Sequence, residues 1–313
     1  MIDSSRKRIV WALDPFEENG PSRMAVFEVL REYGARGASI QPVYILSPTE
    51  YDINIEFNAP WLKRVRPAVQ KLVEHSIKGI KIPGMLPVET IVESHSTLFQ
   101  TIKTFISHAQ RLRADLIVVG THSRKGISRL FLGSFAETLL LYSKIPVLVA
   151  GSRTENQPAK GSRPILFITD FVHHSRKTFE KVVRLAKERR SKVVLFHVIP
   201  HPIEPFVKLG VYLLAGGFVT YPDFVTQEEQ RKKQIADEYV QLAKKQGVTV
   251  EIHFDRGNRG TVPAVIGQAK KMKAGLIAMA AQSGPTAAAV LGSIARQVVR
   301  SAPCPVWVLR TSK

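Results

Sequence analysis

The hydrophobic residues of this chain follow two kinds of pattern, which alternate from one end to the other. Short runs rich in Val, Ile and Leu are typical of strands that are buried on both faces. Longer stretches, in which apolar residues recur every three or four positions, indicate amphipathic helices. The predicted strands are 7–14, 38–46, 87–94, 115–120, 145–150, 164–170, 192–198, 248–255, 276–280 and 304–309. The predicted helices are 23–33, 61–78, 97–113, 134–143, 174–189, 227–246, 260–273 and 293–301.

The order of these elements predicts the fold class. Strands that alternate with helices and are apolar on both faces form a parallel sheet with helices on each side. The pattern also occurs twice, because residues 132–149 and 291–308 superpose without a gap at an offset of 159, with seven identities in eighteen positions. We therefore predict an α/β protein of two domains, residues 1–151 and 163–313, joined by the polar linker 152–162.

The second domain carries an insertion at about residues 200–226, which is long, apolar and punctuated by Gly and Pro. A segment this apolar must bury itself. Three placements stay open. The insertion is a flap packed on its own domain, a lid over a ligand cavity, or a contact between the two halves.

Composition favours a globular protein of a reducing compartment. Hydrophobic residues make up 44% of the chain, which is enough for a core in each domain. The single cysteine, Cys304, rules out an intramolecular disulfide. No apolar stretch has the length that spans a bilayer, and the short apolar run near the N-terminus is predicted as a strand, not as a signal peptide. We therefore expect a cytoplasmic protein.

The net charge of +19, from 45 basic and 26 acidic residues, is unusually high and suggests anionic partners such as nucleotides, nucleic acid or acidic lipid surfaces. The basic residues are nevertheless spread along many helices, and no aromatic–basic motif accompanies them. This distribution favours a solvated basic surface, so we do not expect a dedicated nucleic-acid site. Direct nucleic-acid binding stays the weakest of the alternatives.

The stretch 120–150 contains the candidate site. A strand ends at Gly120, a loop with small, hydroxylated and basic residues follows, and a helix is predicted to open at Gly133 and Ser134. The first backbone N–H groups of a helix lack intrahelical acceptors and carry the positive end of its dipole, so they bind anions. Gly133 lets a phosphate approach the backbone, and Ser134 can cap the helix or bond a phosphate oxygen. Basic loop residues, namely Arg124, Lys125 and Arg129, can neutralise the phosphate charge.

This stretch resembles the ATP-binding loop of the universal stress proteins, Gly-x2-Gly-x9-Gly-Ser/Thr. Gly120, Gly133 and Ser134 match that pattern in type and spacing, whereas Ser123 stands where the family has its second glycine. An ordinary strand–turn–helix crossover is the alternative explanation, but the internal repeat favours the family. The resemblance covers nearly the whole chain and is that of a tandem member. It implies two open-twisted parallel five-stranded sheets, adenine nucleotide alpha hydrolase-like, packed against each other as a pseudo-dimer.

The resemblance also implies roles for individual residues. Asp14, which ends the first strand, corresponds to an acid that bonds the ribose hydroxyls, and backbone groups near Leu46 correspond to the contacts of the base. The triphosphate would lie over the glycines and serines of the loop, with His122 lining it. ATP, which can carry its own Mg²⁺, is the expected ligand. An acid that only closes the turn after the strand is the alternative for Asp14.

The second domain keeps only part of this pattern. Asp170, Gly292 and Ser293 correspond to the acid and to the helix start, but Ala280 replaces the glycine at the end of the fourth strand. No Lys or Arg lies between positions 274 and 295, so a triphosphate would lose charged hydrogen bonds worth roughly 1.5–3 kcal/mol each. We therefore expect ATP mainly in the first domain, and an apolar ligand or no ligand in the second.

The sequence lacks the signatures of a catalytic site. It contains no Walker A sequence, no GxGxxG fingerprint, no Gly-x-Ser-x-Gly elbow and no Cys/His spacing of a metal site. His197 is predicted inside a strand, and the adjacent pair at 173–174 diverges, so we expect no metal. We predict a nucleotide-binding stress-response sensor or regulator, not an enzyme, with hydrolysis that is at most slow and incidental. The alternative is a scaffold that binds no nucleotide, or a binder of an apolar ligand in the second domain; a further homodimer is compatible with both.

Overall fold

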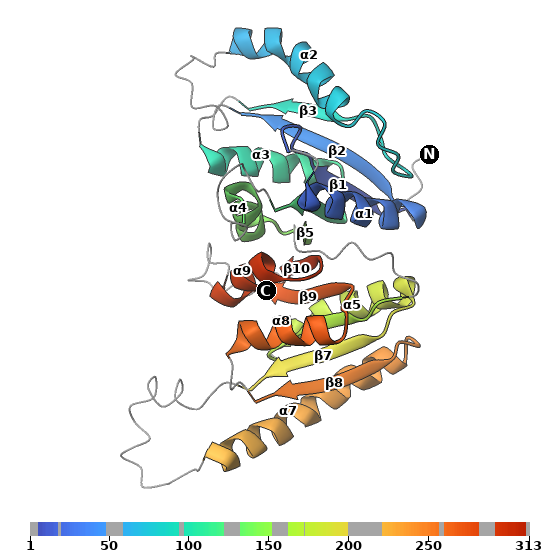
Figure 1. The fold of residues 1–313 in the computed structure, drawn as a ribbon, viewed down its shortest axis with the longest axis vertical. Coiled ribbons are helices and arrows are strands. Elements are labelled where there is room, and N and C mark those ends of the chain that lie inside the picture. Colours follow the sequence, from blue (N-terminus) through green and yellow to red (C-terminus); the bar gives the residue numbers. More distant parts are fainter. Residues whose placement is uncertain are drawn as a thin grey trace, which may run out of the picture. The chain divides into compact units, whose positions relative to one another are not determined.

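The computed structural model describes residues 6–17, 20–47, 59–93, 97–121, 132–151, 162–171, 173–199, 221–256, 260–281 and 292–310 (Figure 1). Its strands are β1 (Arg8–Ala12), β2 (Ser39–Leu46), β3 (Glu89–Val92), β4 (Leu116–Gly120), β5 (Val147–Ala150), β6 (Ile165–Ile168), β7 (Val193–Val198), β8 (Val250–Asp255), β9 (Leu276–Ala281) and β10 (Val306–Arg310). Its helices are α1 (Pro21–Ala35), α2 (Ala59–Ser76), α3 (Leu98–Arg111), α4 (Ser134–Tyr142), α5 (His173–Arg189), α7 (Tyr221–Lys244), α8 (Thr261–Lys271) and α9 (Ser293–Ser301).

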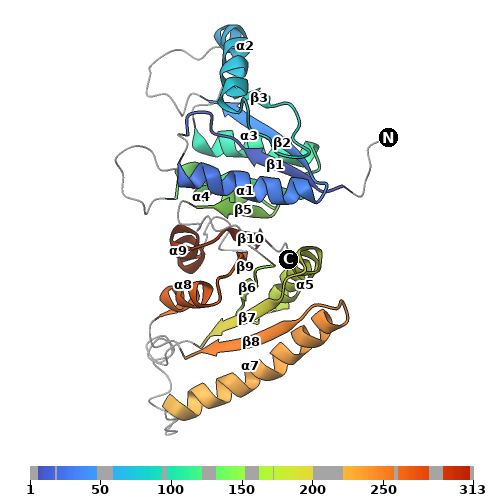
Figure 2. The same cartoon turned by 45° about the vertical axis from the view of Figure 1, so that its right-hand side comes forward.

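In the first repeat, five parallel strands form a sheet in the order β3-β2-β1-β4-β5. The register is set by Ile9 of β1, which pairs with Ile40 on one side and with Leu116 on the other. Every residue of β4 is buried, as the unbroken apolar pattern of this strand requires. Helices cover both faces: a hydrogen bond joins α1 to the end of α2, while Phe105 of α3 packs against Phe135 of α4 with ring centroids 5.6 Å apart (Figure 2).

The strand order reverses between β1 and β4. The chain moves outward from β1 to β2 and β3, returns to β4, and then continues to β5. The connections that leave β1 and β4 therefore lead to opposite sides of the sheet, which makes the carboxyl ends of these two strands its switch point. In open α/β sheets this switch point, outside the carboxyl ends of the strands, is where ligands bind.

The second repeat has the same topology. Strands β9-β6-β7-β8 are parallel, and Ile165 pairs with Val193 and with Leu276 as Ile9 pairs with its two neighbours. The Ile277 N–H donates to the Pro305 carbonyl at 3.0 Å just before β10, as the Ile117 N–H donates to the Pro146 carbonyl at 2.9 Å before β5. The predicted α/β fold of tandem parallel sheets is confirmed, while the domain boundaries and the pseudo-dimer packing stay predictions.

Several element ends differ from the prediction. α3 begins one residue later than expected, and Thr97 caps it by accepting the Gln100 N–H at 3.3 Å. α2 continues through Pro67 from Ala59 to Ser76. α7 begins at Tyr221, six residues before the predicted start, so it includes the end of the predicted insertion; Pro222 suits its first turn. Residues 200–220 of that insertion lie outside the described residues.

None of the helices in the described ranges combines the length and the apolar character needed to cross a membrane.

Gly34 should be essential for the packing of α1. A Cβ at this position would overlap the carbonyl oxygen of Pro83, which belongs to the backbone and cannot rotate away. We expect Gly34→Ala to lower the free energy of unfolding by about 1–3 kcal/mol, measured as a lower Tm in thermal unfolding followed by circular dichroism. Gly292→Ala is the matched control, because Gly292 has a φ of −51° and no described atom lies within 4 Å of the place where its Cβ would be. Equal Tm losses in the two variants would contradict the packing argument.

Cys304 should be unreactive in the folded protein. Burial raises the pKa of its thiol to about 12, an effect that Arg189 and Arg163 only partly oppose. The thiolate is the nucleophile, so its population near pH 8 should be roughly a thousandfold lower than that of an ordinary thiol. We expect Ellman's reagent to label the native protein very slowly. In guanidinium, where the protein is unfolded, it should detect one reactive thiol per chain. Rapid labelling of native protein would show that the thiol is accessible.

Candidate functional site

Asp14 lies at the carboxyl end of β1, where the switch point predicts a crevice. Its side chain is half-buried, and its Oδ1 accepts the backbone N–H of Phe16 at 2.9 Å. This bond closes the turn after the strand, as the alternative explanation of this residue required. A carboxylate has about four acceptor positions, so this turn bond does not by itself exclude contacts with ligand hydroxyls.

Gly120 lies beside the first turn of α1 and the turn that precedes it. A Cβ at Gly120 would lie 3.1 Å from Ser22 Oγ and 3.5 Å from a carboxylate oxygen of Glu17. The Ser22 hydroxyl is also 3.5 Å from Thr121 Oγ1 and 3.5 Å from the Ala150 carbonyl. The ends of β1, β4 and β5 thus meet in one small polar cluster.

Arg23 holds this cluster in place. Its side chain is buried, and its guanidinium donates to the Glu17 carbonyl and, at 2.6 Å, to the Ser76 carbonyl at the end of α2. The guanidinium also lies over the Phe27 ring, 5.5 Å from the centroid. Burial lowers the pKa of Arg23, and the nearby charges of Glu17 and Asp14 oppose that effect. Two acidic side chains and one buried cation therefore share the carboxyl end of β1.

The ends of β2 and β3 form a second polar group. The Leu46 side chain is buried, and its carbonyl accepts the Glu93 N–H at 2.9 Å. The next residue, Ser47, is fully buried, and its hydroxyl is 2.7 Å from that of Thr101 on α3. The Glu93 carboxylate accepts from the Thr104 hydroxyl. These bonds fix the backbone near Leu46 at the carboxyl edge of the sheet, and the Leu46 carbonyl is already bonded to Glu93.

α4 begins at the same edge of the sheet. Gly133 is its N-cap residue, with a φ of −58° and no side-chain cap, and the exposed Ser134 is its first helical residue. Gly133, not Ser134, is therefore the N-cap residue, so of the two alternatives for Ser134 only the contact with a phosphate oxygen stays a prediction. Glu137 in the first turn suits the positive end of the dipole.

The structure thus brings several predicted residues to one edge of the first sheet. Asp14, Leu46 and Gly120 end or follow strands β1, β2 and β4, and Gly133 begins α4. His122, Ser123, Arg124 and Lys125 lie outside the described residues. Sequence reasoning missed the polar residues that complete the cluster. These are Glu17, Ser22, Arg23 and Thr121. The acidic segment between β1 and α1 was the available signal for Glu17.

The matching edge of the second sheet is organised differently. Asp170 Oδ1 accepts the Ser175 hydroxyl of α5 at 2.9 Å, and its carbonyl accepts from Lys232 Nζ at 2.7 Å. Phe171 follows in the left-handed region, with a φ of 59°. Its buried ring packs against Tyr239, with centroids 5.5 Å apart, and against His197, with centroids 5.4 Å apart.

Aromatic packing also changes the ionisation of this edge. Tyr239 is almost fully buried, and burial together with the charge of Asp170 raises the pKa of its hydroxyl to about 12. Gly292 and Ser293 begin α9 as Gly133 and Ser134 begin α4, and Ser293 is exposed. The helix start is therefore kept in both repeats, while the acid in the second repeat is bonded to a neighbouring helix.

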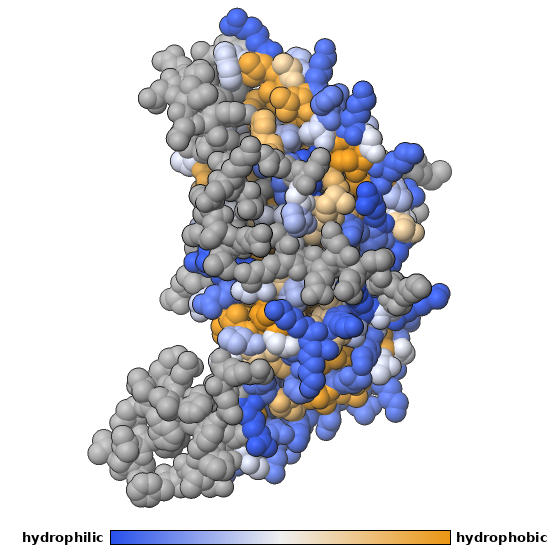
Figure 3. Space-filling view, in the orientation of Figure 1, coloured by the Kyte–Doolittle hydropathy of each residue, from blue (hydrophilic) through white to orange (hydrophobic). Residues whose placement is uncertain are grey.

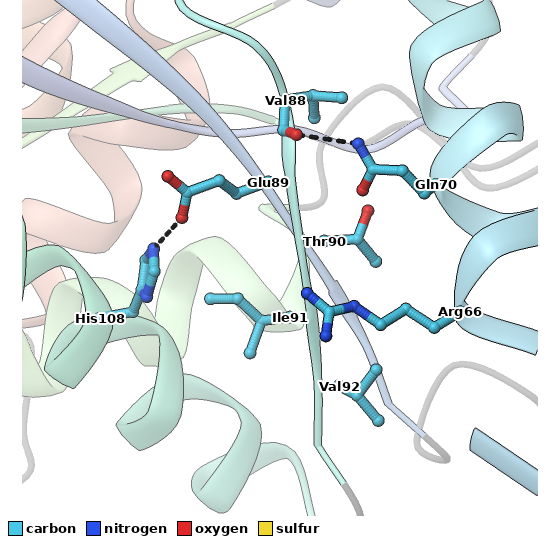
Figure 4. A pocket seen from close by; sticks show the side chains of 8 residues that line it. All are labelled: Arg66, Gln70, Val88, Glu89, Thr90, Ile91, Val92 and His108. Atoms are coloured by element: carbon cyan, nitrogen blue, oxygen red, sulfur yellow. Dashed lines mark hydrogen bonds and ion pairs between the residues drawn. The ribbon is translucent and has the colours of Figure 1, made fainter. Parts of the chain in front are cut away.

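A separate pocket of about 530 Å³ lies along β3, between α2 and α3 (Figure 4). Gln70 donates to the Val88 carbonyl at 2.9 Å on the α2 side, and His108 pairs with Glu89 at 2.8 Å on the α3 side. None of the predicted site residues lines it. Within the described part of the chain, no group of three or more His, Cys, Asp or Glu side chains is placed to hold a metal ion.

Comparison with known proteins agrees with the repeat. The model of the universal stress protein family matches residues 5–151 and again 161–310. A universal stress protein of Mycolicibacterium smegmatis is 24% identical over 303 residues, which cover 94% of this chain and 95% of that protein. A universal stress protein of Methanocaldococcus jannaschii is 28% identical over 145 residues, or 46% of this chain and 81% of that protein.

A solved structure supports the fold along the whole chain. The crystal structure of a universal stress protein from Archaeoglobus fulgidus superposes with a TM-score of 0.59 and 19% identity, covering 97% of this chain and 98% of that one.

Arg23 should stabilise the first repeat through its hydrogen bonds to two backbone carbonyls. Arg23→Met would leave the part-buried Glu17 and Ser76 carbonyls without this donor, at a cost of about 1 kcal/mol for each. We expect a clearly lower midpoint in urea unfolding. Arg31→Met is the control, since Arg31 lies over the same Phe27 ring, 6.0 Å from its centroid, but is exposed. If both variants lose the same stability, the buried hydrogen bonds are not responsible.

Proposed function

We propose that this chain, which belongs to the universal stress protein family, binds an adenine nucleotide at the carboxyl edge of its first sheet and acts as a stress-response sensor or regulator. ATP is the nucleotide we expect, and it can bring its own Mg²⁺. The observation that carries the proposal is the convergence of Asp14, Gly120 and the start of α4 at the switch point of one parallel sheet.

Charge favours one orientation of the nucleotide. The Glu17 carboxylate lies beside Gly120, 3.5 Å from the place where a Cβ would be. A phosphate there would meet a like charge at about 4 Å, which costs on the order of 4 kcal/mol at the effective dielectric of a protein surface. We therefore infer that the ribose hydroxyls face Asp14 and Glu17, while the phosphates extend toward the N-terminus of α4.

The helix start suits this arrangement. The φ of −58° at Gly133 is open to any residue, so the backbone conformation of α4 does not itself require glycine. A missing side chain instead allows an anion to approach the first N–H groups of the helix. The exposed Ser134 hydroxyl is a further donor at the same place.

For the second domain we propose that nucleotide binding is lost. The Asp170 carboxylate accepts from Ser175, and Ala280 stands in the place of Gly120. The stretch 274–295 contains no cation to offset phosphate charge. An apolar ligand at this edge is the second candidate function, favoured by the aromatic surroundings of Phe171. Catalysis has no role in either proposal, beyond a slow hydrolysis of bound ATP.

Two further parts of the proposal concern the whole molecule. A tandem member of this family would pair its own two domains as a pseudo-dimer, and such a chain would work in the cytoplasm. Nucleotide binding would then stabilise one conformation of the pair, which is how a binding protein without catalysis acts as a sensor.

The stoichiometry of binding tests the proposal. We expect native mass spectrometry with added ATP to find one nucleotide per chain. Gly133→Val should weaken ATP binding at least tenfold, because the side chain would block the first N–H groups of α4, whereas Gly292→Val should leave the affinity within twofold. Two nucleotides per chain would contradict the loss of the second site. The reverse behaviour of the two variants would contradict the choice of domain, and a copurified apolar molecule without nucleotide would favour the second candidate.

A further inference from the structure

The amino ends of the strands in the second sheet lie in one row. The Gly275 N–H donates to the Pro164 carbonyl, the Ile165 N–H donates to the Lys192 carbonyl, and the Val193 N–H donates to the Thr249 carbonyl, each at 2.9 Å. These bonds connect the starts of β9, β6, β7 and β8. In a parallel α/β sheet the helices end at the edge where the strands begin, so α5, α7 and α8 all end here as well.

This edge gathers basic residues that are far apart in the sequence. Seven exposed cations come from the last turns of three helices and the positions just after them, and we call them the basic edge. They are Lys187, Arg190, Lys244, Lys245, Lys270, Lys271 and Lys273. Along the sequence these residues are dispersed over 87 positions, and it is the topology of the sheet that brings them to one side.

Acidic residues do little to offset this charge. Glu251 at the start of β8 is paired with Lys192 at 2.7 Å, so this acid offsets a lysine outside the basic edge. A second acid near the basic edge is Glu188, in the last turn of α5. Residues 152–313 contain 26 basic and 12 acidic residues, against 19 and 14 in residues 1–151, so most of the excess charge belongs to the second half.

Cations near helix C-termini also stabilise the helix dipole, which is an explanation that needs no ligand. The same edge of the first repeat argues against that explanation alone. There two of the cations bond to their own chain: Arg6 donates to the Gly37 carbonyl at 2.6 Å, and Arg36 pairs with Glu32 at 2.7 Å. Asp115, just before β4, accepts the Arg8 N–H at 2.8 Å, where the second repeat has Gly275.

We infer that the basic edge binds the phosphodiester backbone of a duplex nucleic acid without reading its sequence. Four strands about 4.8 Å apart extend over roughly 15 Å, and a duplex carries one charge per about 1.7 Å, so a facing duplex offers several phosphates to these cations. Lysine side chains supply point charges for phosphate but no base-specific pattern. Figure 3 shows hydrophilic side chains on the side of the second unit where α5 and α7 end in Figure 1.

A membrane surface is the competing anionic partner, and it fits less well. Among the described residues, the large hydrophobic side chains that are exposed lie elsewhere in the chain. They are Phe16, Met24, Leu72, Leu86, Phe99 and Ile294. The basic edge therefore lacks the apolar anchors that a peripheral membrane site uses. In the second unit it also lies at the opposite ends of the strands from Asp170, so the inference does not rest on nucleotide binding.

Fluorescence anisotropy of a labelled 20-base-pair duplex tests this inference with the full-length chain between 50 and 200 mM salt. The triple variant Lys187→Gln, Lys244→Gln, Lys271→Gln removes one exposed cation from the end of each helix. We expect its affinity at 50 mM salt to fall at least tenfold, and the slope of log K against log salt to become shallower by about 2–3, roughly 0.9 for each phosphate that the protein no longer neutralises.

The matched control removes the same charge from the first repeat. Lys78→Gln, Lys81→Gln, Lys103→Gln replaces three exposed lysines there, and its affinity should stay within twofold of the unmodified chain. Replacing Lys187, Lys244 and Lys271 by Arg should keep both affinity and slope. Circular dichroism melting checks that each variant folds, and the single variant Lys273→Gln, outside the helices, should lower the slope by about 1 even if the triple variant is unstable.

Three results would overturn the inference. The first is absence of duplex binding by the unmodified chain at 50 mM salt. The second is an equal loss of affinity in the triple variant and in the control, which would point to net charge alone. The third is binding to vesicles of anionic phospholipid that exceeds duplex binding and disappears in the triple variant, which would assign the edge to a membrane.

Discussion

The parallel pairing of β1 with β4 is the constraint on which the structure of the first repeat depends. β1 is the first strand of the chain and β4 the fourth, so their adjacency forces the chain to leave in one direction and to return on the other face of the sheet. Their carboxyl ends are then neighbours. Asp14 and Gly120 lie at the same edge of the sheet for this reason, although 106 positions separate them. The strand order of the sheet brings the residues of the polar cluster to one edge.

The two repeats share one topology but differ at the carboxyl and amino edges of their sheets. In the first, the carboxyl edge has a turn closed by Asp14 and held by a buried arginine, with a glycine beside it. In the second, Phe171 fills the corresponding region with an aromatic group, and the acid bonds to Ser175. The amino edges differ as well, since in the first repeat Arg6 and Arg36 bond to their own chain. Duplication thus preserved the sheets and left the two ends of the strands to change separately.

Much of this fold could be predicted because periodicity reports burial directly. The apolar runs identified the strands, and the offset of 159 identified the repeat. Fine positions were harder: α3 begins at Leu98, one residue later than predicted, because Thr97 is its N-cap residue. Arg23 gave no signal at all. Its partners are backbone carbonyls 6 and 53 positions away, and every residue type presents a carbonyl. Of the predicted loop residues, Ser123 and its neighbours lie outside the described part of the chain.

The bonds of Arg23 have a mechanical consequence. One planar guanidinium joins the turn after β1 to the last residue of α2, and it also lies over the Phe27 ring. A displacement of that turn must therefore break one of these hydrogen bonds or move the end of α2 with it. Since α2 packs on the edge strand, β3, the Arg23 side chain links the turn after the central strand, β1, to the helix at the edge of the sheet.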